Sequence, residues 1–80
     1  YIYGVGLVAK YYEPHIPRKD GFIVSDGQPK PEEFCGYPVQ YLSELQLPEG
    51  GGIILCLNEK NQREVLPLLK ERGIAEIFCV

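Results

Sequence analysis

The chain has 80 residues, so it forms one small domain at most. A content of 45% hydrophobic and 24% charged residues is typical of a soluble globular protein and excludes a disordered chain. The formal net charge of −3 provides no basic field for DNA or RNA. No apolar run approaches the roughly 20 residues that cross a bilayer. We therefore expect no nucleic-acid partner and no membrane insertion.

Three cysteines, Cys35, Cys56 and Cys79, are an odd number and show no C-x-x-C or Cys/His ligand spacing. A disulfide framework needs even pairing in a secreted protein, and a zinc site needs closely spaced ligands. Cys56 and Cys79 lie in the apolar runs ILCL and IFCV, where a thiol acts as a small hydrophobe. We expect a cytoplasmic protein with structural cysteines, no metal site and no secretory signal.

Methionine is absent, and the first residue already lies within an apolar strand pattern. We interpret residues 1–80 as a single domain and as a fragment of a longer protein. In that case the domain packs on other domains of its parent chain, and part of the function belongs to sequence outside these residues.

The first half of the chain alternates strand and helix patterns. Residues 1–5 (YIYGV) are mostly β-branched or aromatic and predict a strand, and residues 6–13 predict a helix of about two turns. Pro14 ends that helix. A four-residue apolar run predicts a second strand over 22–25. The proline- and glycine-rich residues 27–37 predict a loop.

The second half continues the alternation. Residues 38–40 predict a rudimentary strand, and residues 41–47 predict a turn or two of helix closed by Pro48. After a flexible hinge over 49–52, the apolar run 53–57 (IILCL) predicts a strand buried on both faces of a parallel sheet.

The segment 58–73 (NEKNQREVLPLLKERG) predicts the last helix, with an apolar stripe formed by Val65, Leu66 and Leu69. Asn61 followed by Glu64 resembles a capping box, and Gly73 is placed to end the helix. Pro67 removes a backbone hydrogen bond in a helix interior, so we expect either a kink there or a late helix start. Residues 74–80 predict the final strand.

Strands separated by helical patterns predict an α/β fold with a mostly parallel sheet. Right-handed crossovers would place helices on both faces of that sheet. We therefore expect a three-layer, Rossmann-like open sheet. Numbered along the chain, its strands have the predicted order 3-2-1-4-5, and the third strand, at Val39, is rudimentary.

Gly4, Gly6 and Ala9 have the spacing G-x-G-x-x-A between a predicted strand and a predicted helix. In a dinucleotide-binding turn these positions provide the tight turn, the close approach of a pyrophosphate and the helix–strand contact. Backbone N–H groups of Gly6, Leu7 and Val8 would then point from the helix N-terminus at an anion. Asp26 follows Gly4 by about 20 residues, at the end of the next strand, where a ribose-binding acid is expected.

Each of these residues has a structural alternative. The glycines could serve only a close strand–helix crossing, and Asp26 could be a turn residue before Gly27. Asn58 follows the 53–57 strand, where it either faces the same crevice or only begins the last helix. His15 is the single histidine and has no nucleophile at a recognisable spacing. The sequence therefore predicts no catalytic residue, and it leaves the cofactor unknown.

Several segments together resemble a small Rossmann-like domain of bacterial polysaccharide and glycan biosynthesis proteins. That domain is similar to the N-terminal nucleotide-sugar-binding domain of pilin-glycosylation-type sugar acyltransferases. The resemblance covers nearly the whole chain. It is carried by IYGVG at 2–6, GFIVSD at 21–26, GYPV at 36–39, LSEL at 42–45 and LKERGI at 69–74.

The resemblance implies a module that binds a nucleotide or nucleotide-sugar, such as a UDP-sugar, and is not catalytic alone. Acyl transfer in that family belongs to a separate left-handed β-helix. Gly4, Gly6 and Asp26 match nucleotide-contacting positions of the family. Two alternatives stay open: the truncated NAD(P)-binding half of an oxidoreductase, and a non-binding Rossmann-like adaptor or dimerisation domain.

Overall fold

The computed structural model describes residues 1–17, 19–46 and 51–80. Within these ranges the chain forms one six-stranded sheet and two α-helices. The strands are β1 (Ile2–Tyr3), β2 (Phe22–Val24), β3 (Glu33–Phe34), β4 (Tyr37–Tyr41), β5 (Ile53–Leu55) and β6 (Ile77–Cys79). The helices are α1 (Leu7–Tyr12) and α2 (Glu59–Glu71), with the 3-10 turns η1 (Glu13–His15) and η2 (Leu42–Glu44).

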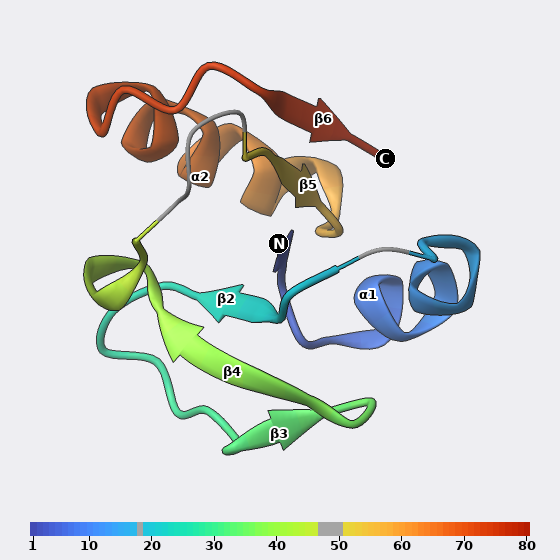
Figure 1. Cartoon of the computed structure of the whole chain (residues 1–80). Helices are drawn as coiled ribbons and strands as arrows, with labels where there is room; N and C mark the ends of the chain where they lie inside the picture. The colour runs from blue at the N-terminus through green and yellow to red at the C-terminus, as the bar shows by residue number, and fades with distance from the viewer. Residues whose placement is uncertain (18, 47–50) are drawn as a thin grey trace.

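The strands are ordered β3-β4-β2-β1-β5-β6, and Figure 1 shows β3 and β6 at the two edges of the sheet. Every neighbouring pair is parallel except β3 with β4. The prediction of a mixed α/β fold with a mostly parallel sheet is therefore confirmed. The predicted five-strand order 3-2-1-4-5 differs from this sheet, because β3 adds a sixth, antiparallel strand.

Strand β3 lies in residues 27–37, which the sequence predicts as a loop. It pairs with β4 across the two-residue turn Cys35–Gly36, where φ is +53° and +83°. Positive φ at both central residues is what a type I′ hairpin turn requires. The loop prediction is wrong at this point because a glycine and a strained cysteine together form a tight hairpin.

Side chains of the central strands alternate between two buried clusters. Ile2 of β1 and Phe22 of β2 belong to one cluster, which also contains Ala9 of α1. The next residue on β1, Tyr3, belongs to the other cluster, together with Leu69 of α2. Successive strand residues point to opposite faces of a sheet. The two helices therefore cover opposite faces.

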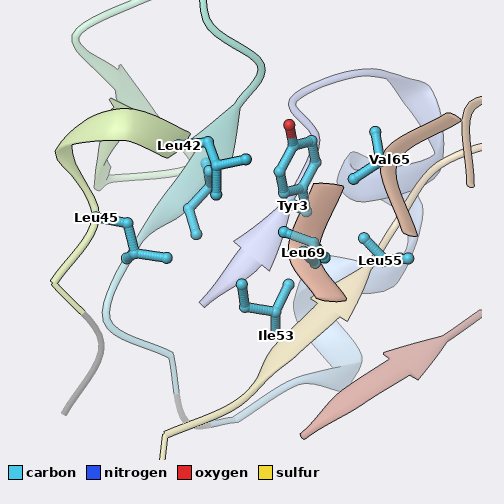
Figure 2. Close-up of a cluster of buried hydrophobic side chains, with 8 residues drawn as sticks. Tyr3, Leu42, Leu45, Ile53, Leu55, Val65 and Leu69 are labelled. Carbon is cyan, nitrogen blue, oxygen red and sulfur yellow. The ribbon is translucent and has the colours of Figure 1, made fainter. Parts of the chain in front are cut away.

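Figure 2 shows the cluster on the α2 face, with Leu42, Val65 and Leu69 around the ring of Tyr3. Leu69 is fully buried, and so are Ile53 and Leu55 of β5 beneath the helix. Burying apolar side chains contributes roughly 25 cal/mol per Å² of surface removed from water. This cluster fixes α2 against the sheet, and so fixes the start of α2 beside the carboxyl end of β5.

Helix α1 has six residues, and the chain continues into η1 instead of stopping at Pro14. Pro14 occupies an N-terminal position of η1, where its missing N–H has no helical partner to lose. Ala9 is fully buried, in agreement with the prediction that a small residue marks the helix–strand contact. Lys19, which is almost wholly buried, pairs with Glu13 at 3.1 Å and holds the chain that leads into β2.

Helix α2 begins at Glu59, about two turns before Pro67, so the alternative of a late helix start does not hold. Its N-cap is Asn58, whose side-chain oxygen accepts a hydrogen bond from the Asn61 N–H at 2.9 Å. The predicted capping box at Asn61 and the late helix start are therefore wrong. Pro67 lies inside the continuous helix and is exposed. Gly73, with φ of +78°, ends the helix as predicted.

The remaining differences concern length and exposure. The helix predicted over 41–47 is only η2, and residue 47, Pro48 and part of the predicted 49–52 hinge lie outside the described residues. Cys56 is buried as expected, but Cys79 is exposed because β6 is an edge strand. No helix among the described residues is long and apolar enough to span a membrane.

Candidate functional site

The carboxyl ends of the parallel strands lie along one edge of the sheet. Strands β1 and β5 are neighbours there, yet the chain leaves β1 through α1 toward β2 and leaves β5 through α2 toward β6. Because the two helices cover opposite faces, a crevice forms where the connections diverge, and ligands of open α/β sheets bind at such points. A pocket of about 310 Å³ lies at this place.

The pocket is formed by the ends of β1, β2 and β5 and by the first turns of α2. It is lined by Tyr3, Gly4, Val5, Val24, Ser25, Gln28, Pro29, Leu57, Asn61, Glu64 and Val65. Hydroxyl, amide and carboxylate groups share the wall with aliphatic side chains. This mixture is typical of a small-molecule site.

Two hydroxyl groups meet at the pocket wall. The Tyr3 hydroxyl and the Ser25 Oγ are 2.5 Å apart in a hydrogen bond in which either oxygen can donate. The ring of Tyr3 belongs to the buried cluster on the α2 face, while its hydroxyl points away from Leu69 and Ile53 (Figure 2). Burial raises the pKa of Tyr3 above its ordinary value, so the phenol is neutral and available as a hydrogen-bond donor at neutral pH.

Helix α2 supplies the opposite wall through Asn61 and Glu64. Both residues are exposed and lie in the first two turns of the helix, which the Asn58 cap holds in place. In the described part of the chain the ion pairs are Lys19–Glu13 and Arg63–Glu59, so Glu64 keeps an unneutralised carboxylate. Among the described residues, no lysine or arginine lines the pocket.

Gly4 is brought into the pocket wall, and packing explains its identity. Its φ is +117°, and an added Cβ would lie 2.8 Å from the Cys56 carbonyl oxygen and 2.8 Å from Leu57 Cδ2. A side chain there would be strained in its backbone and would clash with β5. The predicted role of Gly4 as the tight-turn glycine therefore fits this geometry.

Gly6, Leu7 and Ala9 do not line the pocket. Gly6 is the N-cap of α1 and is exposed, and no atom of the described residues lies within 4 Å of an added Cβ. Leu7 is 86% exposed, whereas Ala9 is fully buried beneath the helix. Close packing thus explains why a small residue occupies position 9, while no described neighbour of Gly6 would clash with a side chain there.

Asp26 and Asn58, the two polar residues that the sequence predicts for the site, also lie outside the pocket lining. The Asp26 carboxylate accepts a hydrogen bond from the Ser43 N–H at 3.1 Å, at the start of η2. The Asn58 side chain caps α2. Each has a local structural role of the kind that the sequence offered as an alternative.

The polar groups that do line the pocket were missed by the motif-based prediction. Tyr3 and Ser25 lie at the carboxyl ends of β1 and β2, and this placement alone could have singled them out. Asn61 and Glu64 read as a capping pattern and not as site residues. Because α2 begins at Glu59, Asn61 and Glu64 lie in its first two turns, beside the carboxyl ends of the strands. The sequence pattern alone does not show this position.

The pocket offers hydroxyl, amide and carboxylate groups that can hold a ligand. Its lining, drawn from the described residues, contains no histidine or cysteine. The described residues also contain no group of three or more histidine, cysteine or carboxylate side chains that could hold a metal ion. Comparison of the chain with protein-family models, curated proteins and solved structures gave no match.

Proposed function

We propose that this chain is a Rossmann-like module that binds a nucleotide or a nucleotide-sugar, with a UDP-sugar as the first candidate. It would serve a cytoplasmic bacterial protein of polysaccharide or glycan biosynthesis and would carry no catalytic group itself. The observation that supports this proposal is the pocket of about 310 Å³ at the carboxyl ends of β1, β2 and β5. Ligand sites of open α/β sheets concentrate at that position.

The size and chemistry of the pocket are compatible with part of such a ligand. Small-molecule sites generally have volumes of about 300–1,000 Å³, so this pocket would hold one ring and leave the rest of the ligand on the surface. Val5 and Leu57 offer an apolar wall, and Tyr3 and Ser25 offer hydroxyl groups. The open space in front of Gly6 leaves room for the remaining part of the ligand.

Calorimetric titration of the domain with UDP-glucose, NAD⁺ and coenzyme A tests the proposal. We expect micromolar binding of UDP-glucose and at least tenfold weaker binding by Gly6→Val, because its side chain would fill the open space beside the pocket. Leu68→Ala, which removes an exposed side chain of α2 outside the pocket, is the control. Preference for NAD⁺ would favour the oxidoreductase alternative. No binding of any of the three would favour the adaptor.

A further inference from the structure

We infer that the pocket between the strand ends and α2 holds an uncharged, hydroxyl-bearing ring and excludes the phosphate groups of the ligand. The ring would be the ribose or the hexose of a nucleotide-sugar. This inference rests on the proposed function and assigns an orientation to the ligand within it. It is carried by the charge and the hydrogen-bonding groups of the pocket lining.

The charge of the pocket disfavours a phosphate. Glu64 contributes a carboxylate that has no cationic partner among the described residues, and the lining contains no lysine or arginine. Two negative charges a few Å apart repel each other, more strongly in a crevice than in bulk water. Phosphate groups are therefore expected outside the pocket, toward the exposed turn at Gly6.

The same carboxylate favours hydroxyl groups. A carboxylate is an acceptor with two oxygens, and hydroxyl groups that donate to it form charge-assisted hydrogen bonds. Adjacent hydroxyl groups on a sugar ring can share one carboxylate. Glu64 is thus suited to a diol, which is the group that ribose and hexoses present.

The other lining residues, on α2 and at the strand ends, complement this acceptor. The Tyr3 and Ser25 hydroxyls share one hydrogen bond, so one of their two protons remains for a ligand oxygen. Asn61 and Gln28 add side-chain amides, each of which can both donate and accept. Leu57 and Val65 supply aliphatic surface for the C–H face of a ring. A site that binds a sugar ring needs hydrogen-bond donors and acceptors for the hydroxyl groups and an apolar surface for the C–H face, and this pocket combines all three.

Substitution of Glu64 by glutamine gives opposite results for the two orientations. If Glu64 accepts hydrogen bonds from hydroxyl groups, Glu64→Gln weakens binding of UDP-glucose about tenfold. If a phosphate occupies the pocket, removal of the negative charge strengthens binding. Glu71→Gln, on the last turn of the same helix and outside the pocket, changes the net charge equally and is the matched control.

The experiment is a calorimetric titration of the wild type and both variants with UDP-glucose, uridine and inorganic phosphate. Weaker binding of both uridine and UDP-glucose by Glu64→Gln places the ribose in the pocket, and weaker binding of UDP-glucose alone places the hexose there. Unchanged or stronger UDP-glucose binding overturns the orientation but leaves the proposed function intact. Absence of UDP-glucose and uridine binding by the wild type overturns the proposed function itself.

Discussion

Gly4, at the end of β1, lies against the carbonyl oxygen of Cys56, at the end of β5, so closely that an added Cβ would be 2.8 Å from that oxygen. The contact joins the two strands whose diverging connections form the pocket. It also gives one glycine of the G-x-G-x-x-A pattern a role that needs no ligand. The other glycine, Gly6, has no such contact.

Gly4→Ala is expected to lower the free energy of unfolding by about 1–3 kcal/mol, because a side chain at positive φ is strained and this one also meets backbone. Gly6→Ala is the matched control and should change the free energy of unfolding by less than about 1 kcal/mol, since its Cβ enters open space at an ordinary φ. Urea denaturation of both variants measures the difference. Equal destabilisation by the two substitutions would contradict the contact described at Gly4.

The β3–β4 hairpin predicts a stabilising substitution. Cys35 has φ of +53°, a region that asparagine tolerates better than other residues with a side chain. Cys35→Asn should therefore raise the free energy of unfolding by about 0.5–1 kcal/mol. Cys35→Val should lower it, because a β-branched side chain is strained at positive φ. Thermal or urea unfolding that ranks valine above asparagine would exclude the type I′ geometry.

Buried acidic groups predict a loss of stability in alkali. Burial raises the pKa of the Cys56 thiol above its ordinary value of 9.0. The unfolded chain then loses this proton at a lower pH than the folded chain does, so the free energy of unfolding falls as pH rises above about 9. Burial likewise raises the pKa of Tyr3 above 10.0, outweighing its hydrogen bond to Ser25, and extends the fall to higher pH.

Denaturant unfolding between pH 8 and about pH 10 measures this effect. Cys56→Ala should flatten the fall that begins near pH 9, even though the lost side chain lowers stability at every pH. Cys79→Ala removes a thiol that is exposed on the edge strand and serves as the control, with the wild-type slope retained. A slope that is identical in all three proteins would show that the Cys56 thiol is not the group responsible.

Much of this architecture was predictable from local pattern. The apolar runs around Ile23 and Ile54 are buried strands of a parallel sheet, as their continuous hydrophobicity indicates. Gly73 ends the last helix as its position suggests. These features depend on burial and on backbone conformation, both of which a sequence expresses within a few residues.

The parts that were not predicted depend on relations between segments. The Cys35–Gly36 turn lacks the asparagine or aspartate that signals a type I′ hairpin, so β3 was expected to be loop. The polar wall of the pocket joins Ser25 of one strand end to Glu64 of a helix that is distant in sequence. Such a wall has no motif of its own, because it follows from how α2 docks on the sheet.

The sequence motif and the structure give Asp26 different roles, ribose binding and a local hydrogen bond, and substitution of Asp26 can distinguish them. Its carboxylate accepts a hydrogen bond from the Ser43 N–H, and it is not part of the pocket lining. Asp26→Ala should therefore lower the free energy of unfolding by about 0.5–2 kcal/mol, the usual cost of losing a side-chain cap. Asp26→Asn keeps an acceptor oxygen and should preserve both stability and UDP-glucose affinity within about twofold.

Urea denaturation and calorimetry on the two Asp26 variants separate the structural role from the ligand role. The ribose-binding role that the sequence predicts for Asp26 requires Asp26→Asn to bind UDP-glucose much more weakly while it stays as stable as the wild type. The proposed orientation of the ligand instead gives acceptance from hydroxyl groups to Glu64, which lines the pocket together with Ser25. If Asp26→Asn binds UDP-glucose weakly while Glu64→Gln keeps full affinity, the sugar hydroxyls contact Asp26, as the sequence motif predicts, and not Glu64.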